Sequence, residues 1–190
     1  MANSKADFYQ AKLDELYAII QRLNPSSPDA DLEEFASCFA ATCNINLKSM
    51  NLHSLPSVNR EETIEDIKDV LLNYHIEDRQ VVHFSLAPDG HTAFCQTVQR
   101  LNVMGDIIEP FHETQVVTFD DEGLVKAMNT YCCWSPIVAK IQKKTGMGPY
   151  AEGWEDPLAG AKMARMEKRA RENGVSSMGS KVDVGSGCCT

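Results

Sequence analysis

Residues 111–125 read FHETQVVTFDDEGLV, and this stretch carries the clearest structural signal in the chain. Phe111, Val117 and Phe119 are separated by even numbers of residues and so share one face of an extended chain, which is typical of a strand with one buried face. Asp120 to Gly123 then form an acidic turn, and apolar residues resume at Leu124. The stretch therefore predicts a strand, a tight turn and the beginning of the next strand.

Residues on both sides of this stretch extend the pattern. Short turn sequences, Pro88-Asp89-Gly90 and Met104-Gly105-Asp106, separate further runs with strand alternation. We expect four strands, over residues 81–86, 92–103, 107–119 and 124–134. Strands joined by such short turns form an antiparallel meander, which buries one face under other elements.

The N-terminal part of the chain has a helical period instead. Apolar residues at three- and four-residue spacing predict a helix over about 8–23, which ends before Pro25. A second helix is expected to begin at Asp31 as its N-cap, with Glu34 as the reciprocal acid. A brief strand over 43–47 and a third helix from Asn59 follow. Helices and strands in separate runs indicate the α+β class.

The C-terminal part differs in composition. Residues 137–144 predict a helical turn, residues 158–173 an exposed helix with many charges, and residues 174–190, rich in Gly and Ser, no regular structure. We therefore expect one domain over 1–145 and an extension over 146–190.

Charge and cysteine content narrow the functional classes. The chain of 190 residues has a net charge of −9, and all of this excess lies in residues 1–150. An acidic domain lacks the positive surface that nucleic acids and anionic membranes attract, so neither partner is expected. The seven cysteines have no C-x-x-C or zinc-ligand spacing, which predicts reduced thiols, no bound metal and a cytoplasmic protein. Without a nucleotide-binding glycine motif, we expect no cofactor.

The order of these elements, together with residues 111–125, resembles the nuclear-transport-factor-like or SnoaL-like superfamily, which includes ketosteroid isomerases, scytalone dehydratases and polyketide cyclases. The resemblance implies a cone in which a curved antiparallel sheet packs on three N-terminal helices around an apolar cup. It also implies a homodimer formed through the outer face of the sheet.

The resemblance suggests which residues line the cup. If the strand over 107–119 faces inward as in ketosteroid isomerases, Glu113 enters the cup as a proton donor or acceptor, flanked by Phe111 and Gln115. The alternative is that Glu113 pairs with Arg100 or lies in water at the rim. Tyr17 takes the place of a tyrosine that binds an oxyanion in those isomerases, or else it only packs with its helix. The remaining substrate-binding candidates are Gln99, Met128, Asn129 and Trp134.

Two histidines complete the candidate set. His83 lies on a predicted strand, where it could share proton transfer with Glu113, and His53 lies in a loop that covers the pocket in related proteins. For each of them a purely structural role is the alternative.

These residues favour a cofactor-independent isomerase, cyclase or dehydratase of secondary metabolism, which would act on a small apolar metabolite by acid–base chemistry. The alternative is a protein of the same superfamily that only binds a ligand, or a dimeric adaptor. The family's isomerase base is not found, because the matching region reads Asn44-Ile45-Asn46-Leu47.

Overall fold

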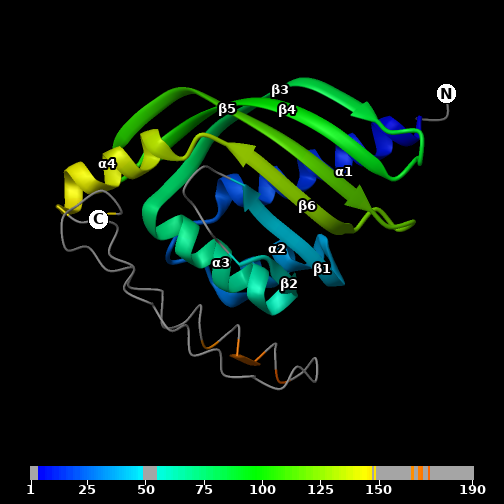
Figure 1. Cartoon of the computed structure of the whole chain (residues 1–190), viewed down its shortest axis with the longest axis horizontal. Coiled ribbons are helices and arrows are strands. Elements are labelled where there is room, and N and C mark those ends of the chain that lie inside the picture. Colours follow the sequence, from blue (N-terminus) through cyan, green and yellow to red (C-terminus); the bar gives the residue numbers. More distant parts are fainter. Residues whose placement is uncertain are drawn as a thin grey trace, which may run out of the picture. The chain divides into compact units, whose positions relative to one another are not determined.

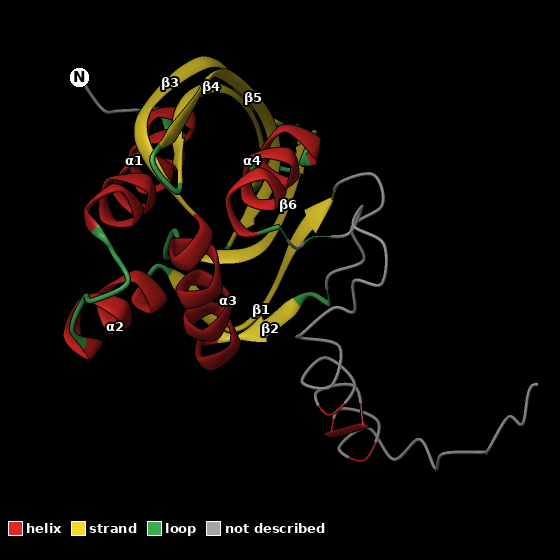
Figure 2. Cartoon of the chain, turned by 90° about the vertical axis from the view of Figure 1, so that its left-hand side faces the viewer, coloured by secondary structure: helices red, strands yellow, loops and turns green. Residues whose placement is uncertain are grey.

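A six-stranded sheet organises the chain in the computed structural model, which describes residues 4–48, 55–146, 148, 164, 167, 168 and 171. Four of the strands form the expected antiparallel meander: β3 (Tyr74–Leu86), β4 (Thr92–Val103), β5 (Asp106–Phe119) and β6 (Val125–Cys132). The strands bend into an arch, with α1 and α4 on its concave side (Figure 2). The α+β class and the curved sheet of the cone are confirmed.

Two further strands lie beyond β6. β1 (Phe39–Lys48) is longer than the strand expected over 43–47, and it pairs with β6 in the parallel direction (Figure 1). β2 (Ser57–Asn59), which the sequence pattern did not indicate, pairs with β1 and completes the order β2-β1-β6-β5-β4-β3.

Four helices accompany the sheet. α1 (Lys5–Arg22) and α3 (Arg60–Asn73) lie where the apolar period predicts them, and Asn59 caps α3. α2 (Asp29–Ser37) begins earlier than expected: its N-cap is Pro28, and Asp31 lies in the first turn. The expectation of Asp31 as N-cap was wrong, because the Pro28 carbonyl already accepts hydrogen bonds of the first turn from the amides of Asp31 at 3.0 Å and Leu32 at 3.4 Å. α4 (Ser135–Thr145) follows β6 and ends at Gly146.

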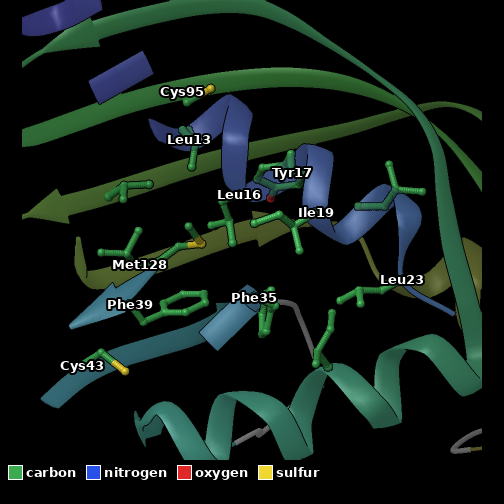
Figure 3. Packing of buried hydrophobic residues seen from close by; sticks show 14 of the residues in the cluster. Leu13, Leu16, Tyr17, Ile19, Leu23, Phe35, Phe39, Cys43, Cys95 and Met128 are labelled. Carbon is green, nitrogen blue, oxygen red and sulfur yellow. The ribbon is translucent and has the colours of Figure 1, made fainter. Parts of the chain in front are cut away.

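The core lies between α1 and the concave face of the sheet. Leu13 and Leu16 of α1 and Leu23 at its C-cap are fully buried, and Figure 3 shows side chains of α1 gathered with Phe35 and Met128. Each buried side chain of this size contributes about 2 kcal/mol to folding. The core therefore fixes the position of α1, and with it the direction of Tyr17.

Two register shifts in β3 determine which of its side chains face this core. They lie between Ile76 and Asp78 and between Val81 and His83. Each shift of this kind adds a residue to one strand and moves the following side chains to the other face. Arg79 and Val81 consequently share the concave side, whereas His83 does not.

The contacts of the chain divide it into two compact units, residues 1–154 and residues 155–190. Within the helix expected over 158–173, the described residues are helical; they are Ala164, Glu167, Lys168 and Arg171. The other residues of that range, and the tail over 174–190, lie outside the described residues. None of the described helices has the length and apolar character needed to cross a membrane.

Candidate active site

A hydrogen bond between α1 and β5 forms the centre of the site. The Tyr17 hydroxyl donates to Oε1 of Glu113 at 3.0 Å. Tyr17 is buried in the stripe of α1 that faces the sheet, and Glu113 is half-buried on the concave face of β5. The Tyr17 ring packs in the core with its helix, as one alternative expected, and its hydroxyl is directed at the carboxyl group of Glu113.

Two glutamines hold the same carboxylate oxygen. The side-chain amide of Gln99 on β4 donates to Oε1 of Glu113 at 3.1 Å, and that of Gln115 donates to it at 2.5 Å. Gln115 also donates to the hydroxyl of Tyr17. Three donors therefore converge on Oε1, and within the described part of the chain no hydrogen bond is formed by Oε2 of Glu113.

Burial sets the proton affinities of this pair. Loss of solvent raises the pKa of the Glu113 carboxyl above its ordinary value, although the hydrogen bonds from Tyr17 and Gln115 and the charge of Arg79 lower it in part. Burial, followed by the charge of Glu113, raises the pKa of Tyr17 well above that of a free phenol. Tyr17 is thus a neutral hydrogen-bond donor, and Glu113 can be protonated more readily than a carboxyl group in water.

Arg79 is a site residue that the sequence analysis missed. Its side chain is 5% exposed, its guanidinium carbon lies 4.1 Å from the centroid of the Tyr17 ring, and Nη1 contacts Asp14 of α1 at 2.8 Å. Alternation continued backward from Val81 would have placed Arg79 on the inner face. The strand predicted from the sequence begins at residue 81, so it does not include Arg79.

Apolar and sulfur-containing side chains adjoin the carboxyl group. Cys132 of β6 lies directly across from Glu113, and burial, together with the charge of Glu113, raises the pKa of its thiol to about 12. Tyr74 and Trp134 meet edge to face, with ring centroids 5.3 Å apart, and burial raises the pKa of Tyr74 as well. The expected lining residues Phe111 and Met128 are buried on the same concave side.

Two of the expected site residues, His83 and Asn129, are not brought to this cluster. His83 is exposed and pairs with Gln96, so it lies on the outer face; the shift after Val81 reversed its direction. Asn129 pairs with Val116 and also lies on the outer side, as the alternation of β6 requires. The expectation that both line the cup was therefore wrong. His53 lies outside the described residues.

Arg100, the alternative ion-pair partner expected for Glu113, pairs with other residues. Arg100 contacts Glu77 at 2.9 Å and Glu109, both on the exposed side of the sheet, instead of Glu113. Among the described residues no cluster of three or more His, Cys, Asp or Glu side chains is arranged to hold a metal ion. The chemistry that the arrangement offers is proton transfer at Glu113.

Comparison with solved structures supports the same fold. The chain is 11% identical to a candidate polyketide cyclase from Xanthomonas campestris pv. campestris, with a TM-score of 0.55 over 73% of this chain and 99% of that one. A candidate isomerase from Bacillus subtilis, also 11% identical, matches with a TM-score of 0.58 over 76% of this chain and 96% of that one.

A third match decides the fold. A hypothetical protein from Catenulispora acidiphila, described as having a ketosteroid isomerase-like fold and solved with trimethylamine, is 12% identical, with a TM-score of 0.54 over 68% of this chain and 90% of that one. This chain has the nuclear-transport-factor-like cone fold. No family model matches the sequence, and no curated protein matches it.

Proposed function

We propose that this chain is a cofactor-independent isomerase, cyclase or dehydratase that uses Glu113 for proton transfer. The observation that supports this most directly is the bond from Tyr17 to a half-buried Glu113, whose carboxyl pKa burial raises. A carboxyl group whose pKa moves toward the working pH is an effective general acid or base. The cyclase and isomerase neighbours of the cone fold are consistent with this class.

The two carboxylate oxygens have different roles in this proposal. Oε1 is held by Tyr17, Gln99 and Gln115, which fixes the plane of the carboxyl group. Oε2 then takes a proton from a substrate carbon beside a carbonyl group and returns it at another position. We assign Tyr17 to holding Glu113, since its hydroxyl donates to the carboxylate.

The lining residues suggest the class of substrate. Phe111, Met128 and the Tyr74–Trp134 pair offer apolar surface near the carboxyl group. Apolar side chains with a few polar groups are typical of sites for small organic ligands. We therefore propose a small, largely apolar biosynthetic metabolite with one carbonyl group as the substrate.

We further propose a cytoplasmic homodimer formed through the outer face of the sheet. Phe94 of β4 and Tyr131 of β6 are 44% and 47% exposed there, and large exposed apolar side chains on one face favour an interface. Reduced thiols support the compartment, because the five cysteines in the described part of the chain are free.

The experiment that tests the enzyme proposal uses exchange of acidic C–H protons. The purified protein is incubated with β,γ-unsaturated cyclic ketones in D₂O, and proton NMR follows both deuterium uptake and isomerisation. We expect Glu113→Gln to lose at least about 100-fold in rate, as expected for the loss of a general base. Glu109→Gln, the same change at an exposed position of β5, should retain the rate.

The outcomes separate an enzyme from a binding protein. Equal rates for wild type and Glu113→Gln would overturn the role of Glu113. A ligand that co-purifies in native mass spectrometry, with no exchange on any ketone, would instead favour the ligand-binding alternative.

A further inference from the structure

Arg79 is unusual among the charged groups of the structure because its cation is almost completely buried. The side chain is 5% exposed, and Nη1 forms its ion pair with Asp14, which is 47% exposed. Nη2 donates to the Cys95 sulfur at 3.5 Å, and Nε is buried without a hydrogen-bond partner in the described part of the chain. Burying a cation with an unsatisfied N–H costs free energy, so a purely structural ion pair is a poor explanation.

The position of the guanidinium suggests what offsets this cost. Its central carbon lies 4.1 Å from the centroid of the Tyr17 ring, within the range of a cation–π contact. The hydroxyl of the same ring donates to Oε1 of Glu113. The Arg79 cation therefore contacts the Tyr17 ring, and the Tyr17 hydroxyl contacts the Glu113 carboxyl group. On its other side the Arg79 cation is held by Asp14.

We propose that Arg79 is a positioning residue of the Glu113 site, whose cation acts on the carboxyl group through the Tyr17 ring and its hydrogen bond. This inference rests on the proposed function only for its catalytic consequence, because the electrostatic coupling is a property of the folded protein. The positive charge favours the ionised forms of Tyr17 and Glu113 and so opposes burial, which raises the pKa of both. Arg79 thus keeps Glu113 able to act as a base.

Other titratable groups around Glu113 interact electrostatically with Glu113 or with one another. They come from α1, β3, β4 and β6, and they are Asp14, Tyr17, Tyr74, Arg79, Cys95 and Cys132. Arg79 is the only cation in this set. Removing its charge therefore leaves burial without an opposing positive group.

The test measures the titration of Glu113 directly. Protein labelled with ¹³C at the glutamate carboxyl carbon is titrated by NMR, and the Glu113 signal is assigned by its absence in Glu113→Gln. In Arg79→Met the midpoint should shift upward, whereas Arg79→Lys, which keeps the charge, should stay near the wild-type midpoint. Arg100→Met, which removes a cation from an exposed ion-pair network of the same sheet, serves as the matched control and should not shift it.

The outcomes decide the proposal without a substrate. An unchanged midpoint in Arg79→Met, or equal shifts in the Met and Lys variants, would show that Arg79 only packs between α1 and β3. Should Arg79→Met fail to fold, Arg79→Gln supplies a second neutral variant with a polar end group. If ketone exchange is detected, its pH dependence should move upward with the Glu113 midpoint. If exchange is absent, the titration still tests Arg79, so failure of the enzyme proposal remains distinguishable.

Discussion

The Tyr17 hydroxyl and Oε1 of Glu113 lie 3.0 Å apart although 96 positions separate the two residues in the chain. The first helix and the penultimate strand of the sheet must both be in place before this bond can form. The candidate site is therefore a consequence of the whole cone, and not of any local motif.

Removing the Tyr17 hydroxyl should change the site more than the fold. In Tyr17→Phe the ring still packs in the core, but Glu113 loses a donor that lowers its pKa, so its titration midpoint should rise further. We expect a rate loss of about tenfold and a loss of about 1 kcal/mol of stability. Carboxyl NMR, ketone exchange and urea denaturation measure these effects.

Tyr9→Phe is the matched control, because the Tyr9 hydroxyl donates to the Asp120 carbonyl group, away from Glu113. A comparable stability loss in both variants, with a shifted Glu113 midpoint only in Tyr17→Phe, is the expected pattern. The same midpoint in both would contradict the direct link between Tyr17 and Glu113.

Much of the fold could be predicted from the sequence because turn residues mark the ends of its strands. β4 has the expected bounds, since Gly90 precedes it and Gly105 follows it, and both adopt positive φ. β3 could not be predicted as well. Its two register shifts interrupt the alternation, so the predicted strand began seven residues late, and His83 was assigned to the wrong face.

The site was partly predictable for a similar reason. Gln99 on β4 and Glu113 and Gln115 on β5 lie in stretches of regular alternation, so period two predicts which residues share a face, and the resemblance to ketosteroid isomerases indicated which face is concave. The direction of Arg79 could not be inferred in the same way, because Arg79 lies between the two register shifts of β3. Its contact with Tyr17 depends on packing between α1 and β3, which no spacing in the sequence encodes.

The stability of the protein should depend on pH through Glu113 in a specific direction. Burial keeps the pKa of the folded carboxyl above its ordinary value of 4.5, so the unfolded chain ionises first as the pH rises. The contribution of Glu113 is complete below that value and is lost as the pH rises through the folded pKa. Urea denaturation from about pH 4 to about pH 8 should therefore show Glu113→Gln gaining stability relative to wild type.

Glu77→Gln provides a control of opposite sign. Hydrogen bonds from Asn102 and Arg100 lower the pKa of Glu77, so its contribution is present above the ordinary value and is lost as the pH falls through the folded pKa. This variant should lose stability relative to wild type as the pH rises. Parallel trends in the two variants would refute the opposite assignments.

Neutralising Asp14 should destabilise the fold because it leaves the Arg79 cation buried without its ion-pair partner. Asp14 is 47% exposed, so water compensates in part, and we expect Asp14→Asn to cost about 1–2 kcal/mol. Glu15→Gln removes the same charge from an exposed pair with Lys12 and should cost less than about 0.5 kcal/mol. Equal costs in urea denaturation would mean that water already solvates the Arg79 cation.

The proposed homodimer gives the last prediction, and it depends on the outer face of the sheet. Phe94 of β4 and Tyr131 of β6 lie one strand apart on that face, and each leaves nearly half of its side chain in solvent. A charge placed in an apolar interface is costly to bury, so Phe94→Glu should convert a dimer into a monomer in native mass spectrometry. Leu72→Glu adds the same charge on α3, where Leu72 is 65% exposed, and should leave the dimer intact. A wild-type monomer would refute the proposed homodimer. Loss of the dimer only in Leu72→Glu would place the interface at α3 instead of on this face.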